Sequence, residues 1–563
     1  MRSTVLLGVL ALCGISRAVP AADPGPRYDR RWVWVMTNLL VEQEADRVVA
    51  LVERAGRDGY NGVVINDYKL NFLGRMPKHY FAHVARVKAA ADRAKVELIP
   101  AVFPIGYGNG LLSNDVNLAE GMPVADAPFV VRGGEAILVT NPEARLKNGD
   151  LEETRGDVFT GFGYQDAPGK ATVADRAVVH GGKVACRMQD LAATPVCRLI
   201  QGVKVRPHAC YRLSCWAKTR DLEPIGAFRL MAMGASGRPL SFHEGGLGPT
   251  RDWTRLEVVF NTQDQAEVNL YAGLWGAKGG TLWLDDLALE EMSLVNVLRR
   301  DGCPLTVASE DVKTVYVEGK DFEPVRDPKL GMVPYEGEYD FNHAGPPLKL
   351  TTASRLKDGD RLRVSWYHPV LVLGSYVACC LSEPKVYDLL RDQARRVNDL
   401  YKPKTFFMQH DEMRVANWCL ACRSRKLTPG ALLADNAKRC VEILKEVGPE
   451  ARAIVWSDMF DPNHNAGKDY YLVNGTLAGS WEGLDRAVLI ANWNGGKAKA
   501  SLDFFAGRGH KQVLAGYYDG DDNFATWDAA AKGVPGVLGF MYTTWQNRYD
   551  DLERYGKLMA PRK

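Results

Sequence analysis

The chain has 563 residues, a formal net charge of +3 at pH 7 and 25% charged residues, so it is too long for one ordinary domain and has the composition of a globular protein. It has no basic block or stripe, which argues against nucleic acid or an anionic membrane as a partner.

The N-terminus has the layout of a secretory signal peptide. Arg2 precedes an apolar run over residues 5–12, and small residues follow over 18–21. The run is too short to anchor the chain stably in a bilayer. We expect a signal peptide over 1–21, with Ala18 as the second choice for the cleavage site, and a secreted or periplasmic protein with no membrane partner.

From residue 31 the sequence alternates predicted strands and helices. Short apolar runs predict strands, and apolar residues at helical spacing predict the helices between them. The predicted strands are 32–36, 62–67 and 96–102, and the predicted helices are 42–55 and 78–95. Three such units in a row predict a parallel sheet with helices outside it.

From about residue 110 to 369, short strands and turns replace the helical periodicity. Segment 145–292 resembles the jelly-roll carbohydrate-binding modules, which open on a stretch like Asn148-Gly149-Asp150 and close on a strand like Trp283-Leu284-Asp285-Asp286. Segments 111–144 and 293–370 are predicted to form a second β-rich insertion.

In those modules acidic residues often hold a structural calcium ion. The resemblance implies Asp150, Glu152 and Asp286 as its ligands, which suits the preference of calcium for carboxylate oxygens. Surface acids at strand ends explain the same pattern equally well.

The alternation of strands and helices resumes after residue 370. The predicted helices are 383–400 and 432–447, and the predicted strands end near Met408, Asp458, Trp493, Asp519 and Trp545. Three strands before the insertions and five after them make eight. The fold class is therefore α/β, a (β/α)8 TIM barrel built from 22–110 and 371–563 and interrupted after its third strand by all-β insertions.

In such a barrel the active site lies at the C-terminal ends of the strands. Asp411 and Glu412 follow the buried apolar strand 405–408, where charges are costly unless they have partners or a task. The alternative is a helix N-terminus whose free amides these acids cap.

Aromatic and polar side chains at the other strand ends suit a sugar. Rings stack on the apolar face of a pyranose, and carboxylates and amides bind its hydroxyl groups. The loop 458–465 is either a substrate loop or a self-contained turn rich in Asx residues. Substrate contacts are expected from His410, Trp456, Asp458, Asn492, Trp493, Asp519, Tyr542, Trp545, Asn547, Asn66 and Asp67.

These strand ends resemble those of the family 20 β-N-acetylhexosaminidases and their clan relatives. The adjacent Asp411-Glu412 pair and the Tyr-x-Asp stretch Tyr517-Tyr518-Asp519 carry the resemblance. It implies retaining, substrate-assisted hydrolysis of β-linked N-acetylhexosamine glycans without a catalytic cofactor. Glu412 would be the general acid, Asp411 would orient the 2-acetamido group, and Tyr517 would hydrogen-bond its oxygen.

The chain also departs from that family. Family members carry Trp-x-Glu on the last strand where this chain has Trp545-Gln546-Asn547, and the loop 103–107 after the third strand lacks their histidine. The identity of the terminal sugar therefore stays open.

Two other functions are compatible with the same residues. A conventional retaining glycosidase would use Glu412 as acid/base and Asp519 or Asp458 as nucleophile, with the two carboxyl groups about 5 Å apart. A non-catalytic protein would use barrel and jelly roll only to bind glycan. In each case the partner is an oligo- or polysaccharide.

The cysteines are expected to pair in part, because an exported protein meets an oxidising compartment. Cys419 and Cys422 form a CxxC motif, which is compatible with zinc, but no second CxxC or histidine pair lies at zinc-finger spacing. A local disulfide or a bridge to Cys440 is the expectation.

Overall fold

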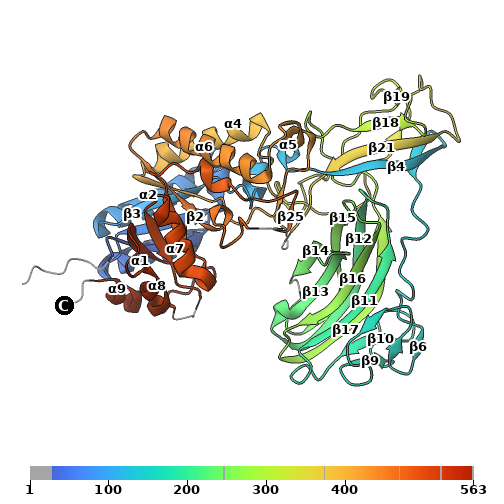
Figure 1. Ribbon diagram of the computed structural model, residues 1–563, viewed down its shortest axis with the longest axis horizontal. Coiled ribbons are helices and arrows are strands. Elements are labelled where there is room, and N and C mark those ends of the chain that lie inside the picture. Colours follow the sequence, from blue (N-terminus) through green and yellow to red (C-terminus); the bar gives the residue numbers. More distant parts are fainter. Residues whose placement is uncertain (1–27, 245–246, 373–374, 468, 520–522, 561–563) are drawn as a thin grey trace, which may run out of the picture.

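The computed structural model describes residues 28–244, 247–372, 375–467, 469–519 and 523–560. The predicted signal peptide over 1–21 lies outside these ranges. Figure 1 shows a helix-wrapped part at one end of the molecule and β-rich parts at the other. No helix within the described ranges is long and apolar enough to cross a membrane.

Eight parallel strands close into a barrel, with β28 pairing back onto β1. In barrel order the strands are β1 (Arg30–Thr37), β2 (Gly62–Asp67), β3 (Glu97–Val102), β22 (Thr405–Met408), β24 (Arg452–Trp456), β26 (Leu489–Asn492), β27 (Gln512–Ala515) and β28 (Val537–Tyr542). The prediction of an eight-stranded parallel barrel interrupted after its third strand is confirmed. All four residues of β22 are buried, as expected for a parallel strand covered on both faces.

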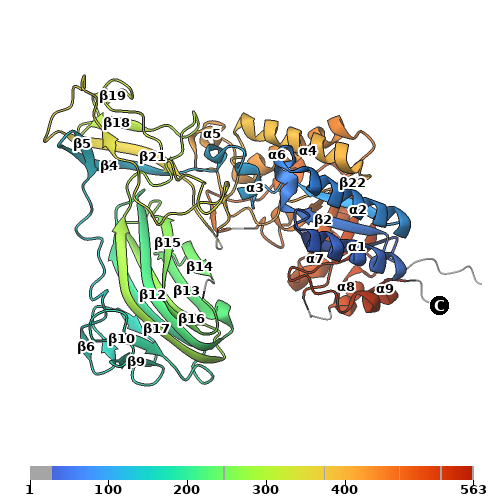
Figure 2. The same cartoon turned by 180° about the vertical axis from the view of Figure 1, so that it is seen from behind.

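Helices follow most of the barrel strands and cover its outer surface (Figures 1 and 2). In α1 the buried residues recur at helical spacing, including Ala45, Val48 and Val52, which is the pattern of a helix packed on a sheet by one face. The helices are α1 (Glu42–Arg57), α2 (Lys78–Ala94), α3 (Asn109–Leu112), α4 (Pro384–Tyr401), α5 (Leu420–Ser424), α6 (Pro429–Val447), α7 (Ala498–Gly507), α8 (Phe524–Ala531) and α9 (Leu552–Met559).

A two-sheet sandwich lies beside the barrel in both ribbon views. Its two five-stranded antiparallel sheets have the orders β15-β12-β17-β10-β9 and β14-β13-β16-β11-β8, and they enclose a hydrophobic core of their own. The strands are β8 (Tyr164–Gln165), β9 (Thr172–Asp175), β10 (Ala185–Met188), β11 (Val196–Lys204), β12 (Cys210–Glu223), β13 (Phe228–Gly234), β14 (Pro239–Glu244), β15 (Arg251–Asn261), β16 (Glu267–Trp275) and β17 (Gly279–Glu291).

A third, six-stranded sheet of order β19-β18-β21-β4-β5-β20 takes strands from both sides of the sandwich in sequence. Buried and exposed residues largely alternate along β21, the pattern of a strand with one face on a core. The strands are β4 (Met122–Arg132), β5 (Glu135–Leu138), β18 (Thr306–Ser309), β19 (Val315–Tyr316), β20 (Leu348–Lys349) and β21 (Arg361–His368). Two short ribbons pair β6 (Thr154–Arg155) with β7 (Val158–Phe159) and β23 (Val415–Ala416) with β25 (Leu472–Val473).

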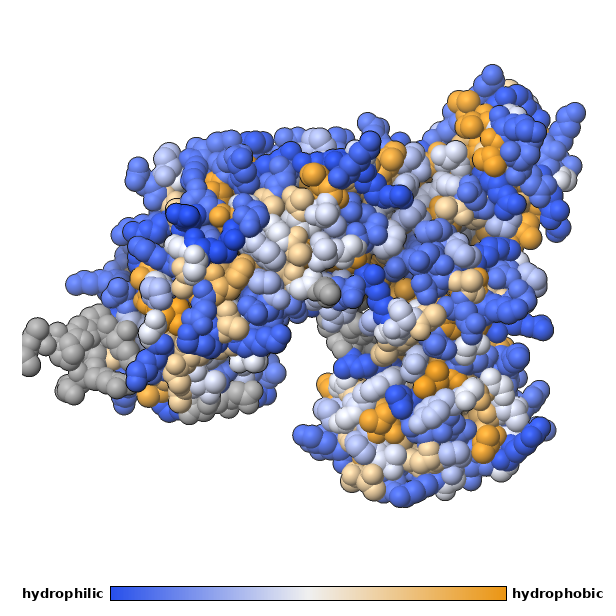
Figure 3. All heavy atoms as spheres, viewed as in Figure 1, coloured by the Kyte–Doolittle hydropathy of each residue, from blue (hydrophilic) through white to orange (hydrophobic). Residues whose placement is uncertain are grey.

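The surface is mostly hydrophilic, with hydrophobic side chains in scattered groups (Figure 3). One group lies over β19 at the tip of the six-stranded sheet, where Val312, Val315 and Val317 are exposed.

The interior of the barrel is filled by aromatic rings. Trp34 of β1 is fully buried, and its ring centroid lies 5.1 Å from those of Phe407 and Trp456 and 5.5 Å from that of Trp545. These rings join strands that are far apart in the sequence, so they hold the barrel closed and form the base on which the strand ends stand.

Replacing Trp34 with alanine should therefore lower the free energy of unfolding by about 3–5 kcal/mol, since it removes a buried ring and leaves a cavity. Urea unfolding followed by circular dichroism measures the change. The control is Ile137→Ala at a 48% exposed position, for which a change within about 0.5 kcal/mol is expected. Equal effects of the two substitutions would contradict a core role for Trp34.

Candidate functional site

Asp411 and Glu412 lie at the C-terminal end of barrel strand β22. The backbone N–H of Gln409 donates to Val102 O at 2.8 Å, and that of Ile105 donates to Gln409 O at 3.2 Å. These bonds fasten the segment after β22 to the segment after β3. Glu412 has a φ of +48°, a conformation that is costly outside glycine and that clusters at functional sites.

Glu412 has two hydrogen-bond donors on one carboxylate oxygen. Arg414 Nη2 donates to Glu412 Oε2 at 2.5 Å, and the Tyr107 hydroxyl donates to the same oxygen. Arg414 is 5% exposed, and its guanidinium lies over the rings of Tyr107 and Tyr471, at 5.4 and 5.5 Å from their centroids. The guanidinium and the Glu412 side chain form a charge-assisted hydrogen bond.

Asp411 has a different environment. Its Oδ1 is buried and has no hydrogen-bond partner among the described residues. Burial raises the pKa of Asp411 well above the usual range, and the nearby carboxylates of Asp458 and Glu412 raise it further. The neutral form of Asp411 is therefore favoured over its carboxylate, because the charged form would be desolvated and repelled by its neighbours.

Both carboxyl groups line a hollow at this end of the barrel. A cavity of about 350 Å³ is lined by Tyr107, Asp411, Glu412, Trp456, Trp493, Tyr518 and Trp545. A second cavity of about 310 Å³ shares Tyr107, Asp411 and Trp545 with it and adds Met36, Thr37, Asn66, Tyr68, Asn71, Pro104, Asn109, Glu338, Tyr376 and Gln409. The two form one aromatic-walled cleft with Asp411 at the boundary. Trp456 Nε1 is, like Asp411 Oδ1, buried without a partner among the described residues.

Four predicted contact residues line this cleft, namely Trp456, Trp493, Trp545 and Asn66. Asp458 lies behind it: its Oδ2 accepts from the backbone N–H of Glu412 at 2.9 Å and its Oδ1 from Trp493 Nε1 at 3.2 Å. Burial raises the pKa of Asp458 to about 7.

Asp519 holds the loop after β28. It accepts hydrogen bonds from Thr544 Oγ1 and from the backbone N–H groups of Trp545 and Gln546. This places the ring of Trp545 in the cleft wall without exposing a free carboxylate oxygen of Asp519 to a substrate.

In the loop after β24, acidic side chains hydrogen-bond to other residues of the same loop. Asp461 Oδ1 accepts from the backbone N–H of Asn463 at 2.8 Å, and Asn465 Nδ2 donates to Asp458 Oδ2 at 2.9 Å. These are the contacts of the Asx-rich turn, one of the two alternatives for 458–465. The ring of His464 lies against Trp493, with centroids 4.5 Å apart.

The structure does not place Tyr517, the residue expected to hydrogen-bond the acetamido oxygen, in the cleft. Its ring is buried against Tyr542, with centroids 3.9 Å apart, in the layer between barrel and helices. Neighbouring residues of an extended chain point to opposite sides, so Tyr518 is the tyrosine that lines the cleft. Tyr542 is likewise a packing residue, and its hydroxyl donates to Arg548 O.

Four further predicted contacts are occupied elsewhere. His410 is buried, its Nε2 lies 3.0 Å from Asn436 Oδ1 on α6, and burial lowers its pKa to about 4. Asn492 is buried and donates to Gln512 Oε1. Asn547 accepts a hydrogen bond from the Tyr549 hydroxyl. Asp67 accepts hydrogen bonds from the backbone N–H groups of Leu39 and Lys69 and from the Tyr80 hydroxyl.

Several cleft residues were not predicted from the sequence. Tyr107 and Arg414 bind Glu412, and Tyr376 packs edge-on against Tyr107 with centroids 4.5 Å apart. Glu338, from the segment between β19 and β20, lines the cleft, and burial raises its pKa. Tyr107 follows the third strand directly, which was the available signal, whereas nothing in the sequence places Glu338 at the barrel.

Two of the three carboxylates expected to bind calcium have partners within the protein. Glu152 Oε1 accepts from the backbone N–H groups of Lys183 and Val184, Asp286 Oδ2 lies 2.6 Å from His180 Nδ1, and Asp150 is exposed. Over the described part of the chain, one group of His, Cys, Asp and Glu side chains has its ligand atoms within 4.8 Å of one another, and it contains none of these three.

The expected disulfide is absent as well, since all ten cysteines from Cys186 to Cys440 are free. Cys440 is buried in α6, with its thiol 3.9 Å from Asn436 Oδ1.

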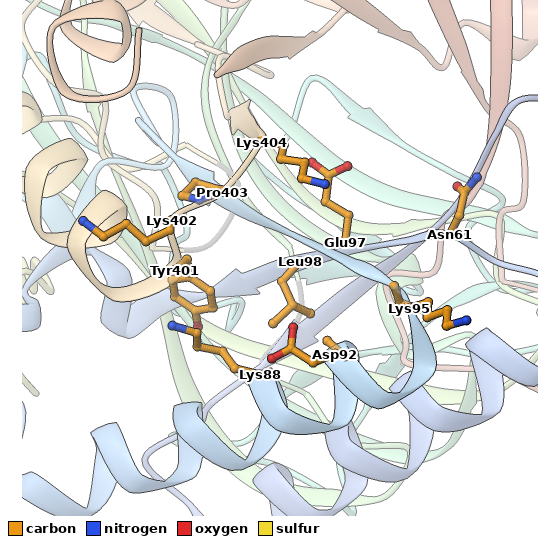
Figure 4. Close-up of a pocket in the computed structure, with 12 residues that line it drawn as sticks. Asn61, Lys88, Asp92, Lys95, Glu97, Leu98, Tyr401, Lys402, Pro403 and Lys404 are labelled. Atoms are coloured by element: carbon orange, nitrogen blue, oxygen red, sulfur yellow. The ribbon is translucent and has the colours of Figure 1, made fainter. Parts of the chain in front are cut away.

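A larger depression of about 490 Å³ opens at the opposite end of the barrel (Figure 4). Lys88, Lys95, Lys402 and Lys404 surround it, together with Asp92 and Glu97. It lies at the N-terminal ends of β3 and β22 and has no contact with the Asp411-Glu412 pair, so we assign the functional site to the cleft.

No protein-family model matches the chain, and no curated protein matches it. Among solved structures, a "Family 16 Carbohydrate Binding Module-2" is 20% identical over 26% of this chain and 99% of that one, with a TM-score of 0.20. The module TmCBM61 in complex with β-1,4-galactotriose is 16% identical over 27% of this chain and 97% of that one, with a TM-score of 0.19.

A rhamnosidase from Novosphingobium sp. PP1Y covers 88% of this chain and 52% of its own, at 12% identity and a TM-score of 0.30. These likenesses are too distant to assign a family. None of these three is a family 20 β-N-acetylhexosaminidase.

The structural role of Asp67 gives a pH-dependent prediction. Burial raises the pKa of Asp67 from 3.8 to about 6, against three hydrogen bonds that lower it. The folded state therefore holds this proton more tightly than the unfolded state, and the contribution to stability present below pH 4 is lost as the pH rises through 6.

Replacing Asp67 with asparagine should remove this contribution. The free energy of unfolding of the wild type should fall relative to Asp67→Asn between pH 4 and 6, by up to about 1.4 kcal/mol per pH unit. Urea titrations at a series of pH values measure the difference. Parallel pH curves for the two proteins would show that Asp67 ionises normally.

Proposed function

We propose that the protein is a glycosidase of the (β/α)8 type that hydrolyses O-glycosidic bonds of an oligo- or polysaccharide in the aromatic cleft. The observation that carries the proposal is Asp411, whose buried carboxyl group has a raised pKa and an Oδ1 without a partner among the described residues, beside the Arg414-paired carboxylate of Glu412. An acid and an ionised carboxylate in one cleft are the pair that glycoside hydrolysis requires. Trp456, Trp493 and Trp545 supply rings on which a pyranose stacks.

The environments of the two carboxyl groups assign the roles in the reverse of the family 20 pattern. Asp411 donates its proton to the glycosidic oxygen as the bond from that oxygen to the anomeric carbon breaks. Glu412 stays ionised, because Arg414 and Tyr107 hydrogen-bond its charged form, and it stabilises the positive charge that develops on the sugar. The Asp411 carboxylate then takes a proton from the water that attacks the anomeric carbon.

The nucleophile of the first step is proposed to be the substrate's own 2-acetamido oxygen. Asp458 and Asp519, the alternatives on the protein, use their carboxylates to hold Glu412, Trp493 and the loop after β28. With these engaged, a substrate-assisted reaction on a β-linked N-acetylhexosaminide needs no further carboxylate. Glu412 would accept the acetamido N–H and thereby orient the attacking oxygen.

A second candidate is glycan binding without catalysis, for which the sandwich offers one observation. The ring of His180 is stacked on Trp216 at a centroid distance of 4.0 Å and lies 5.6 Å from Trp253. The half-buried rings of Trp216 and Trp253 are of the type that offers an apolar face to a pyranose. The position of Asp411 and Glu412 in the wall of a cleft favours the hydrolase.

The proposed roles of Asp411 and Glu412 can be distinguished by how the rate of each variant depends on the leaving group. The substrates are aryl β-glycosides, with and without the 2-acetamido group, whose phenols differ in acidity. Asp411→Asn should lose about 10²–10⁴-fold in kcat/KM on poor leaving groups and much less on acidic phenols, which need no proton. Glu412→Gln should lose activity on every phenol alike. Exposed carboxylates, in Asp388→Asn and Glu446→Gln, provide the matched controls and should leave the rates unchanged.

Four results would contradict the proposal. Leaving-group dependence in Glu412→Gln instead of Asp411→Asn would restore the family 20 assignment of the roles. Equal rates on glycosides lacking the acetamido group would point to a conventional nucleophile. Wild-type rates in both variants would exclude the pair from catalysis, and binding of glycans by an inactive wild type would support the second candidate.

A further inference from the structure

A compact group of sulfur and carboxylate ligands lies where the barrel meets the inserted domains, outside the cleft. It consists of Glu120, Cys380, Cys419 and Cys422, all buried, with their ligand atoms within 4.8 Å of one another. Cys419 and Cys422 flank the start of α5, Cys380 precedes α4, and Glu120 precedes β4. Three separate segments of the chain thus bring ligand-type side chains to one point.

The separations between these atoms are those of a metal site. Cys380 Sγ lies 3.5 Å from Cys419 Sγ and 3.6 Å from Cys422 Sγ. Glu120 Oε2 lies 3.5 Å from Cys419 Sγ and 3.4 Å from Cys422 Sγ. A disulfide requires about 2.05 Å, whereas tetrahedral zinc with Zn–S of about 2.3 Å and Zn–O of about 2.1 Å places sulfurs about 3.8 Å apart and sulfur and oxygen about 3.6 Å apart.

We propose that Cys380, Cys419, Cys422 and Glu120 bind one zinc ion in a closed tetrahedral site. Three sulfur ligands select a borderline-soft ion over calcium or magnesium, and four protein ligands leave no open position for catalysis. Without a shared partner, a buried carboxylate beside three closely spaced thiols is a costly arrangement, and the ion supplies that partner.

The surroundings of the group support this proposal. Three thiolates, one carboxylate and a divalent cation sum to −2. The buried guanidinium of Arg300 interacts electrostatically with Cys380 and Cys419, and it also pairs with Glu383 at 3.1 Å. Cys303 hydrogen-bonds to Cys419 and lies outside the group of four. The outer oxygen of Glu120, Oε1, accepts from the backbone N–H groups of Trp418 and Cys419 at 2.7 and 3.0 Å, which orients the carboxylate.

The ion would hold together the two chain segments that connect the barrel to its insertions. The backbone N–H of Glu120 donates to Ala378 O, and that of Cys380 donates to Leu118 O, so the outgoing and returning segments lie side by side. The CxxC motif joins them through the loop that carries Arg414, the cation bound to Glu412. Loss of zinc should therefore loosen the insertions and the cleft together.

The test uses the full-length wild-type protein. Elemental analysis after dialysis should find about one zinc per chain, as for closed structural sites. Modification of the thiols with a mercurial should release that zinc to a colorimetric chelator in the same ratio. Cobalt substitution should give the visible spectrum of tetrahedral cobalt with thiolate ligands. Absence of zinc, another metal in stoichiometric amount, or a disulfide among these cysteines in the mass spectrum would each overturn the proposal.

Variants assign the ligands. Cys419→Ser and Glu120→Gln should lower the zinc content at least about tenfold after dialysis, as expected when one ligand of a closed site is lost. Cys379→Ala is the matched control, because Cys379 is the equally buried neighbour of Cys380 and lies outside the group, and it should retain one zinc. Should a variant fail to fold, release of zinc from the wild type still decides the question. Full zinc in Glu120→Gln with loss in Cys303→Ser would overturn Glu120 as the fourth ligand.

Discussion

The cleft depends on one electrostatic asymmetry: of two adjacent carboxyl groups, only one is paired with a cation. Arg414 is bonded to Glu412, and the Tyr107 hydroxyl adds to the same oxygen. Asp411 Oδ1 has no such partner, and burial together with two nearby carboxylates raises the pKa of Asp411. The same protein interior thus gives one carboxyl group a cation as its partner and disfavours the charged form of its neighbour. The proposed chemistry follows from that division of charge.

The contacts that maintain this asymmetry come from the segments that follow the barrel strands and not from the strands themselves. Asp458 binds the backbone of Glu412 from β24, Tyr107 reaches it from the segment after β3, and the loop holding Arg414 runs on into the CxxC motif. The proposed zinc site lies at the far end of that loop. The insertions are therefore structural neighbours of the cleft, to which one of them also contributes Glu338.

The number and direction of the barrel strands could be predicted from the sequence, because each is a short apolar run and the first four are accompanied by helices with periodic apolar faces. The acids at the end of β22 could be predicted for the same reason. Which side chain enters the cleft could not be predicted. Tyr517 and Tyr518 differ by one position, and the side that each faces depends on the exact end of β27. Partners distant in sequence, such as Glu120 for the CxxC cysteines, leave no local pattern.

The proposed chemistry requires a protonated Asp411 beside an ionised Glu412 in the resting protein, and infrared spectroscopy at neutral pH tests this requirement directly. The difference spectrum between wild type and Asp411→Asn should contain the C=O stretching band of a protonated carboxyl group, and the difference between wild type and Glu412→Gln should contain only carboxylate bands. A protonated-carboxyl band that disappears in Glu412→Gln and persists in Asp411→Asn would contradict the account.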